Sequence, residues 1–445
     1  MAPSDGVHSR LAAPAWSLAL ASILALWLGG AQPASGDGHP AYPPLSGKAD
    51  KFEKIAREYE QQIARRGMRY DDPALQALVD RVAKQVLPVV ADSFIDFRVR
   101  LVRDPSPRAF SLADGQIYLH TGLLARLQDE AQLAAVLAHE AHHVAAHHHI
   151  ETDRDRRTNA NMTGTVVMLL NSTTGAGESY DSDYLHVVQS VFSETMEFEA
   201  DAASVSMISQ AGYAPAAAAE ALALLRQDPE LSTDRQAAMY DTPGLLAERQ
   251  GRLQRLASEP APPADRQLVG PRPFLLRQVL DMTIDDYLRL DRPGAALKLA
   301  DAALAVQPDA SLYAARGDAH LALGPRPVDL RQDFVVWEID GKRAEKTREE
   351  INAKYLATEG GPERLAHNLE SAKTSYRLAI QADESCARAY RGLGDLHYQQ
   401  HDYREAGRNY LRYLSLEGDS LDRPFVVERL RHIKSELVRQ KDAEP

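Results

Sequence analysis

The sequence predicts a mainly helical α+β protein, in which a helical domain with a small β-hairpin or sheet precedes a second, wholly helical domain. Apolar residues recur at helical spacing through most of the 445 residues. Strand-like alternation is confined to residues 94–102, and a further Asp-Gly turn signal follows it at Asp114 and Gly115. The C-terminal part repeats small and aromatic residues at the offsets of paired helices.

Composition limits the classes of protein that this chain can belong to. Hydrophobic residues make up 44% and charged residues 26%, as in soluble globular proteins, and the length allows two or three domains. The net charge of −12 argues against nucleic acid as the main partner. Cys386 is the one cysteine of the sequence, which rules out an internal disulfide and a cysteine-based structural zinc site.

The N-terminal residues have the pattern of an export signal. Arg10 precedes an apolar run over residues 15–28, and small residues at 31–36 offer cleavage sites, so residues 1–36 are interpreted as a signal peptide. An uncleaved N-terminal membrane anchor facing the periplasm is the alternative. Residues 37–49 form a flexible lead-in rich in Gly, Pro and Ala. A nearly cysteine-free exported chain suits the bacterial periplasm.

Two helices and then strands are expected next. Residues 50–66 are amphipathic, and a second helix starts after Asp72. The turn signal at 114–115 predicts a hairpin just ahead of the next helix. A strand edge there, over Gln116, Ile117 and Tyr118, could pair with an extended peptide substrate, and an ordinary core hairpin is the alternative.

The motif around which the first domain is organised is H-E-x-x-H at His139, Glu140 and His143. Histidines at i and i+4 of a helix lie on one face, so both imidazoles can reach one metal ion. Glu140, beside the first histidine, can poise a water molecule without being a ligand. Residues 124–150 contain no internal Gly or Pro, and their apolar residues follow a helical stripe. The pattern predicts a zinc site of protease type, and a third ligand is required.

Acidic residues supply candidates for that third ligand. A helix over residues 187–210 carries Glu197 and Asp201, which are four apart and therefore on one face. One carboxylate can bind the metal while the other holds an imidazole N–H. A solvated acidic face is the alternative, but apolar neighbours favour a bound cation. Residues 171–180, between the two halves of the site, form either a lid or a plain surface loop.

Together these motifs resemble the zinc metallopeptidases typified by the CAAX prenyl protease and the bacterial HtpX protease, and in particular their periplasmic BepA-like branch. The stretch Ala-Phe-x-Leu-x-x-Gly-x-Ile-Tyr at residues 109–118 fits as well. The resemblance implies one zinc ion per chain. It also implies roles for individual residues: ligands His139, His143 and Glu197, general base Glu140, supporting partner Asp201, substrate edge Gln116, Ile117 and Tyr118, and a transition-state stabiliser at Arg249, with Arg252 as a competitor.

The chain departs from the family pattern at several positions. Thr242 precedes a proline where periplasmic members carry a histidine that caps the zinc, so we expect a more open metal site. Arg108 and the residues at 113–114 differ from the family's hairpin loop. His142, next to a predicted ligand, is expected to point to a different face of the helix. The cluster of His147, His148 and His149 is interpreted as structural or surface residues, with adventitious metal binding as the alternative.

The C-terminal half reads as a recognition domain. A proline-rich linker over residues 259–273 separates a metallopeptidase domain at 50–258 from a helical domain at 274–445. Tyrosine, glycine and alanine offsets there fit two to three degenerate tetratricopeptide repeats, interrupted by an insert at 324–361, with a generic helical bundle as the alternative. A repeat groove would bind extended peptides or partner proteins.

These observations predict a zinc-dependent endopeptidase that cleaves misfolded or misassembled proteins of the bacterial cell envelope. Its expected partners are protein or peptide substrates and envelope proteins bound through the repeat groove. Peripheral membrane association is compatible with this location. A chaperone-like scaffold with a latent protease domain is the alternative from another class, and a non-proteolytic zinc hydrolase would share the metal site.

Overall fold

The computed structural model describes residues 49–89, 95–158, 192–227, 245–258, 277–328, 341–417 and 421–443. The predicted signal peptide, the lid-or-loop segment at 171–180, Thr242 and the predicted linker at 259–273 lie outside these ranges. Within them, none of the helices combines the length and the apolar character needed to cross a bilayer. The predicted class is confirmed, because helices dominate and a small three-stranded sheet accompanies them.

The sheet contains β1 (Arg98–Val102), β2 (Ala109–Ser111) and β3 (Gln116–His120) in the order β1-β3-β2. β2 and β3 are antiparallel, and Gly115 adopts a φ of 90° in the turn between them, which confirms the predicted hairpin. β1 pairs with β3 in parallel. It begins at residue 98, four residues later than the alternation suggests.

The predicted substrate edge is wrong for Gln116, Ile117 and Tyr118, because these residues belong to the central strand. β3 is paired with β1 on one side and with β2 on the other, and all five of its residues are buried. Within the described sheet, the outer strand of the hairpin is β2. A strand's own pattern cannot show this, because the parallel pairing with β1 is a non-local contact.

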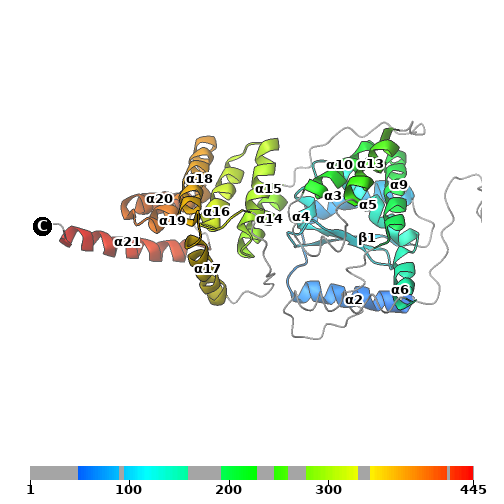
Figure 1. Ribbon diagram of the computed structural model, residues 1–445, viewed down its shortest axis with the longest axis horizontal. Coiled ribbons are helices and arrows are strands. Elements are labelled where there is room, and N and C mark those ends of the chain that lie inside the picture. The colour runs from blue at the N-terminus through cyan, green and yellow to red at the C-terminus, as the bar shows by residue number, and fades with distance from the viewer. Residues whose placement is uncertain are drawn as a thin grey trace, which may run out of the picture. The chain divides into compact units, whose positions relative to one another are not determined.

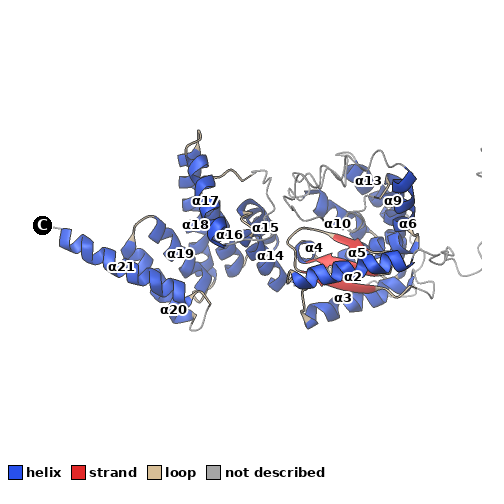
Figure 2. Cartoon of the chain, turned by 90° about the horizontal axis from the view of Figure 1, so that it is seen from below, coloured by secondary structure: helices blue, strands red, loops and turns tan. Residues whose placement is uncertain are grey.

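Helices cover both faces of this sheet (Figure 1). α2 (Ala49–Arg65) lies on one face, where Figure 2 shows it in front of the red strands. The rings of Tyr59 and Tyr118 meet there edge to face, with centroids 4.7 Å apart. α3 (Pro73–Val86) and α5 (Glu130–Ala145) cover the other face. The short α4 (Thr121–Leu124) follows β3.

Among the described residues of this half, four further helices lie around α5. They are α6 (His148–Thr158), α9 (Glu194–Gln210), α10 (Ala216–Gln227) and α13 (Leu245–Ser258). α9 packs along α5, and α13 packs against both α9 and α10. This arrangement matters for function because it brings together segments that are more than a hundred residues apart in the sequence.

In the described C-terminal half, most helices pack on the helix that follows them in the chain, and α16 packs on α18. Their bounds are α14 (Arg277–Arg289), α15 (Pro293–Val306), α16 (Ala310–Leu323), α17 (Gly341–Leu356), α18 (Gly361–Ala382), α19 (Ala387–Gln399), α20 (Tyr403–Leu416) and α21 (Arg423–Ala443). Gly317 and Gly392 face the buried ring of Tyr376, so a Cβ at Gly392 would lie 2.2 Å from that ring. α17 lies within the predicted insert. Whether the pairs are tetratricopeptide repeats stays a prediction.

Candidate metal centre

The centre is built on α5, and a capping residue next to the helix determines where it begins. Asp129 caps the helix by accepting a hydrogen bond from the Gln132 amide at 2.9 Å. The helix stops at Ala145, and His147 follows with a positive φ of 58°. This turn redirects the chain into α6, so that the ring of His148 contacts that of His143. The sequence did not predict that α5 ends at Ala145, because no Gly or Pro lies between residues 124 and 150.

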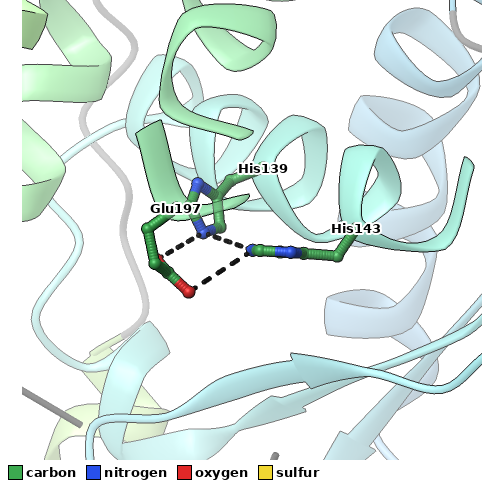
Figure 3. A group of neighbouring side chains, drawn as sticks. All are labelled: His139, His143 and Glu197. Atoms are coloured by element: carbon green, nitrogen blue, oxygen red, sulfur yellow. Dashed lines mark hydrogen bonds and ion pairs between the residues drawn. The ribbon is translucent and has the colours of Figure 1, made fainter. Parts of the chain in front are cut away.

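Three donor side chains from α5 and α9 converge on one point (Figure 3). The Nε2 atoms of His139 and His143 are 3.1 Å apart. Glu197 places one oxygen 3.5 Å from His139 Nε2 and the other 3.7 Å from His143 Nε2. Ligands about 2.0–2.2 Å from a tetrahedral zinc ion would be separated by about 3.3–3.6 Å. The donor set therefore fits one zinc ion, with a fourth position left open.

Each imidazole has a further partner at its other nitrogen. Asp201 lies 3.2 Å from Nδ1 of His139, and Nδ1 of His148 lies 2.9 Å from Nδ1 of His143. Hydrogen bonds of this kind fix the tautomer and orientation of metal-binding histidines. Glu197 and Asp201 thus lie as a pair one turn apart on α9, with one carboxylate in the donor set and the other behind it.

Arg249 joins the centre from α13. Its guanidinium donates two hydrogen bonds of 2.8 Å to Asp201 and lies 2.6 Å from Glu197. Arg252, the competing candidate, stacks instead on the ring of Phe198 at 3.8 Å. Of the two arginines, Arg249 therefore contacts the acidic residues of the site, whereas Arg252 contacts Phe198.

The electrostatics of the centre favour a bound cation. Burial lowers the pKa of His139, but hydrogen bonds and charges from Asp201 and Glu197 outweigh it and raise this pKa to about 10. Burial and neighbouring histidines lower the pKa of His143 well below its ordinary value. Burial alone would raise the pKa of Asp201, but its bonds to Arg249 and His139 keep it well below the usual range. The carboxylates of Asp201 and Glu197 thus stabilise positive charge at the place where a cation would bind.

Glu140 lies beside the donors and is held by a residue that sequence reasoning missed. Glu140 is 9% exposed, and burial raises the pKa of its carboxyl group. Ser111 on β2 donates a hydrogen bond to it at 3.0 Å, and His149 Nε2 lies 3.2 Å from the same hydroxyl. Ser111 pairs with Ile117 across the hairpin and is 1% exposed. The sequence feature that could have indicated Ser111 is a polar residue at a position where the strand turns its side chain towards the core.

Of the two alternatives for the neighbouring histidines, structural or surface, His148 and His149 fit the structural one, because they are 2% and 3% exposed. Phe192 stacks on the ring of His143, with centroids 3.9 Å apart and planes at 11°, and also contacts the two buried histidines. A second layer of side chains, which the sequence did not indicate, therefore encloses one side of the donor set.

A partly buried His-His-Glu donor set, with a second glutamate beside it that is not one of the three donors, is the arrangement expected of a metal-dependent peptidase. Comparison with known proteins agrees, because residues 70–264 match the sequence model of Peptidase family M48. This part of the chain is a domain of that metallopeptidase family.

Three relatives illustrate the match. Mitochondrial metalloendopeptidase OMA1 of Schizosaccharomyces pombe is 29% identical over 43% of this chain and 60% of its own length. Beta-barrel assembly-enhancing protease of Escherichia coli O157:H7 is 24% identical over 44% of this chain and 43% of its own. Metalloprotease LoiP of Escherichia coli K12 is 31% identical over 35% and 60%. The chain spans less than two thirds of each relative.

Proposed function

We propose that the chain is a zinc-dependent endopeptidase that holds one zinc ion through His139, His143 and Glu197. The observation that carries the proposal is the spacing of these donors, 3.1–3.7 Å, with the Glu140 carboxylate next to them. A zinc ion bound there would polarise the scissile carbonyl and lower the pKa of a water molecule in the open position.

Glu140 acts as the general base in this proposal. Its oxygen accepts the proton of the attacking water and then passes it to the leaving amine. Burial raises the pKa of this carboxyl group and so favours its holding the proton between the two steps. The hydrogen bond from Ser111 fixes the orientation of the carboxylate. Asp201 holds the ring of His139 from behind.

Arg249 is proposed as the positive charge that stabilises the transition state. Its bidentate pair with Asp201 fixes the position of the guanidinium next to Glu197. β2 replaces β3 as the proposed substrate edge, because it is one of the two outer strands of the described sheet and, unlike β1, carries Ser111, which contacts Glu140.

The proposed substrates are proteins of the bacterial cell envelope, cleaved when misfolded or misassembled. Support comes from the predicted signal peptide and from two relatives, the beta-barrel assembly-enhancing protease and metalloprotease LoiP of Escherichia coli. In this proposal residues 50–258 form the peptidase domain, 259–273 the linker and 274–445 a tetratricopeptide-type domain. That domain would recognise substrates or partner proteins.

The test compares the purified chain with its Glu140→Gln variant, and Glu194→Gln on the exposed start of α9 serves as a control. Bound zinc and the degradation of an unfolded model protein are measured for all three. We expect about one zinc ion in each, with cleavage by the parent and the control alone. Zinc without cleavage in the parent would favour the latent scaffold, and hydrolysis of small esters alone would favour a non-proteolytic hydrolase. A chain that takes up no zinc would refute the proposal.

A further inference from the structure

A second cluster of metal-binding side chains lies beside the candidate centre. His142 from α5, His148 from α6 and Glu199 from α9 offer donor atoms that all lie within 4.8 Å of one another. We propose that this cluster is a second binding site for zinc or a similar divalent transition metal, and that its occupation inhibits the proposed peptidase. The inhibitory part rests on the proposed function, whereas the metal site itself does not.

The chemistry of the cluster suits a borderline metal ion. Two imidazoles and one carboxylate are the donor types that zinc accepts. Nε2 of His148 lies 3.3 Å from a Glu199 oxygen, which is about the separation of two ligands on a tetrahedral zinc ion. His148 is buried, while the Glu199 side chain is 57% exposed, so water can complete the coordination from the solvent side.

His148 links the second site to the first. Its Nδ1 lies 2.9 Å from Nδ1 of His143, and a hydrogen bond between two nitrogens needs one proton. Metal binding by Nε2 of His143 leaves the proton on its Nδ1, so Nδ1 of His148 must accept. The proton of a neutral His148 then resides on Nε2, from which it is donated to Glu199.

A metal ion at the second site requires the same Nε2 lone pair. The proton of a neutral His148 would have to move to Nδ1, where it would face the N–H of His143 and break the hydrogen bond between the rings. His143 would lose the acceptor that orients it for the first metal. Losing such a partner weakens metal binding about 10–100-fold. Metal binding at the second site therefore weakens metal binding at the first, and excess metal should inhibit the proposed peptidase.

Equilibrium dialysis of the purified full chain against increasing free Zn²⁺, with bound zinc measured, tests the site directly. We expect a second, weaker equivalent in the parent that is missing in His142→Gln and in Glu199→Gln. His367→Gln removes an exposed histidine of α18 and should leave both equivalents in place. Circular dichroism confirms folding, and the exposed Glu199 provides a variant that tolerates substitution.

Proteolysis measured over the same zinc range tests inhibition. Activity of the parent should fall as the second equivalent binds, and in His142→Gln the fall should shift at least about tenfold to higher free zinc. Saturation of the parent at one equivalent, or an unchanged second equivalent in both variants, would overturn the site. Undiminished cleavage with both sites filled would overturn inhibition. Two equivalents in a chain that never cleaves would refute the endopeptidase and leave the second site standing.

Discussion

Asp201 supports the candidate centre without being one of its three donors, and Asp201→Asn isolates that contribution. The carboxylate is 5% exposed, receives two 2.8 Å hydrogen bonds from Arg249 and lies 3.2 Å from His139 Nδ1. Asparagine has almost the same shape but a single acceptor oxygen and no charge, so it cannot satisfy both partners. His139 then loses either its orienting acceptor or the charge that favours a cation.

Loss of a supporting partner of this kind lowers metal affinity about 10–100-fold, or about 1.4–2.7 kcal/mol. Zinc affinity is measured by competition with a chromophoric chelator, with thermal unfolding as a check that the variant is folded. Glu194→Gln, which also removes one acidic charge from α9, should bind zinc like the parent. A folded Asp201→Asn chain with parental zinc affinity would refute the assigned role.

Three further predictions follow from the buried contacts. Ser111→Ala removes a hydrogen bond to a carboxylate, worth about 1.5–3 kcal/mol, so kcat should fall about tenfold or more while KM and bound zinc stay near parental values. Burial lowers the pKa of His149 to about 3, whereas an unfolded histidine titrates near 6.5. Since the unfolded chain binds the extra proton, the contribution of His149 to stability should fall by about 2 kcal/mol between about pH 8 and pH 5, and the stability of His149→Gln should fall by that much less than that of the parent. Gly392→Ala should destabilise the C-terminal helices by about 1–3 kcal/mol, because its Cβ would meet a buried tyrosine ring at 2.2 Å.

Each of these three predictions is tested against a control variant or the parent chain. Ser111→Thr keeps the hydroxyl and should restore most of the lost kcat, and equal losses in both variants would argue for a packing effect. Denaturant melts of the parent and His149→Gln with the same pH slope would contradict the buried neutral histidine. A Cβ at Gly407 would make an ordinary 3.6 Å contact, so Gly407→Ala should be neutral or stabilising by up to about 1 kcal/mol. Equal effects of the two glycine changes would refute the steric argument.

The sequence by itself determined what depends on the period of one helix or one hairpin. His139, Glu140 and His143 lie within five residues, and Glu197 and Asp201 are one turn apart, so helical geometry alone predicts which of them share a face. The Asp-Gly turn likewise predicted the hairpin, because its backbone conformation is a local property. Their roles in metal binding and catalysis remain proposals.

Only the tertiary structure decided which distant segments meet. The packing of α13 against α9 brings Arg249 to Asp201, whereas Arg252 stacks on Phe198. The parallel pairing with β1 places β3 at the centre of the sheet. The tertiary structure also brings Ser111 to Glu140. The physical reason is that these contacts arise from the burial of whole elements against each other, and no local pattern records the partner that an element will find.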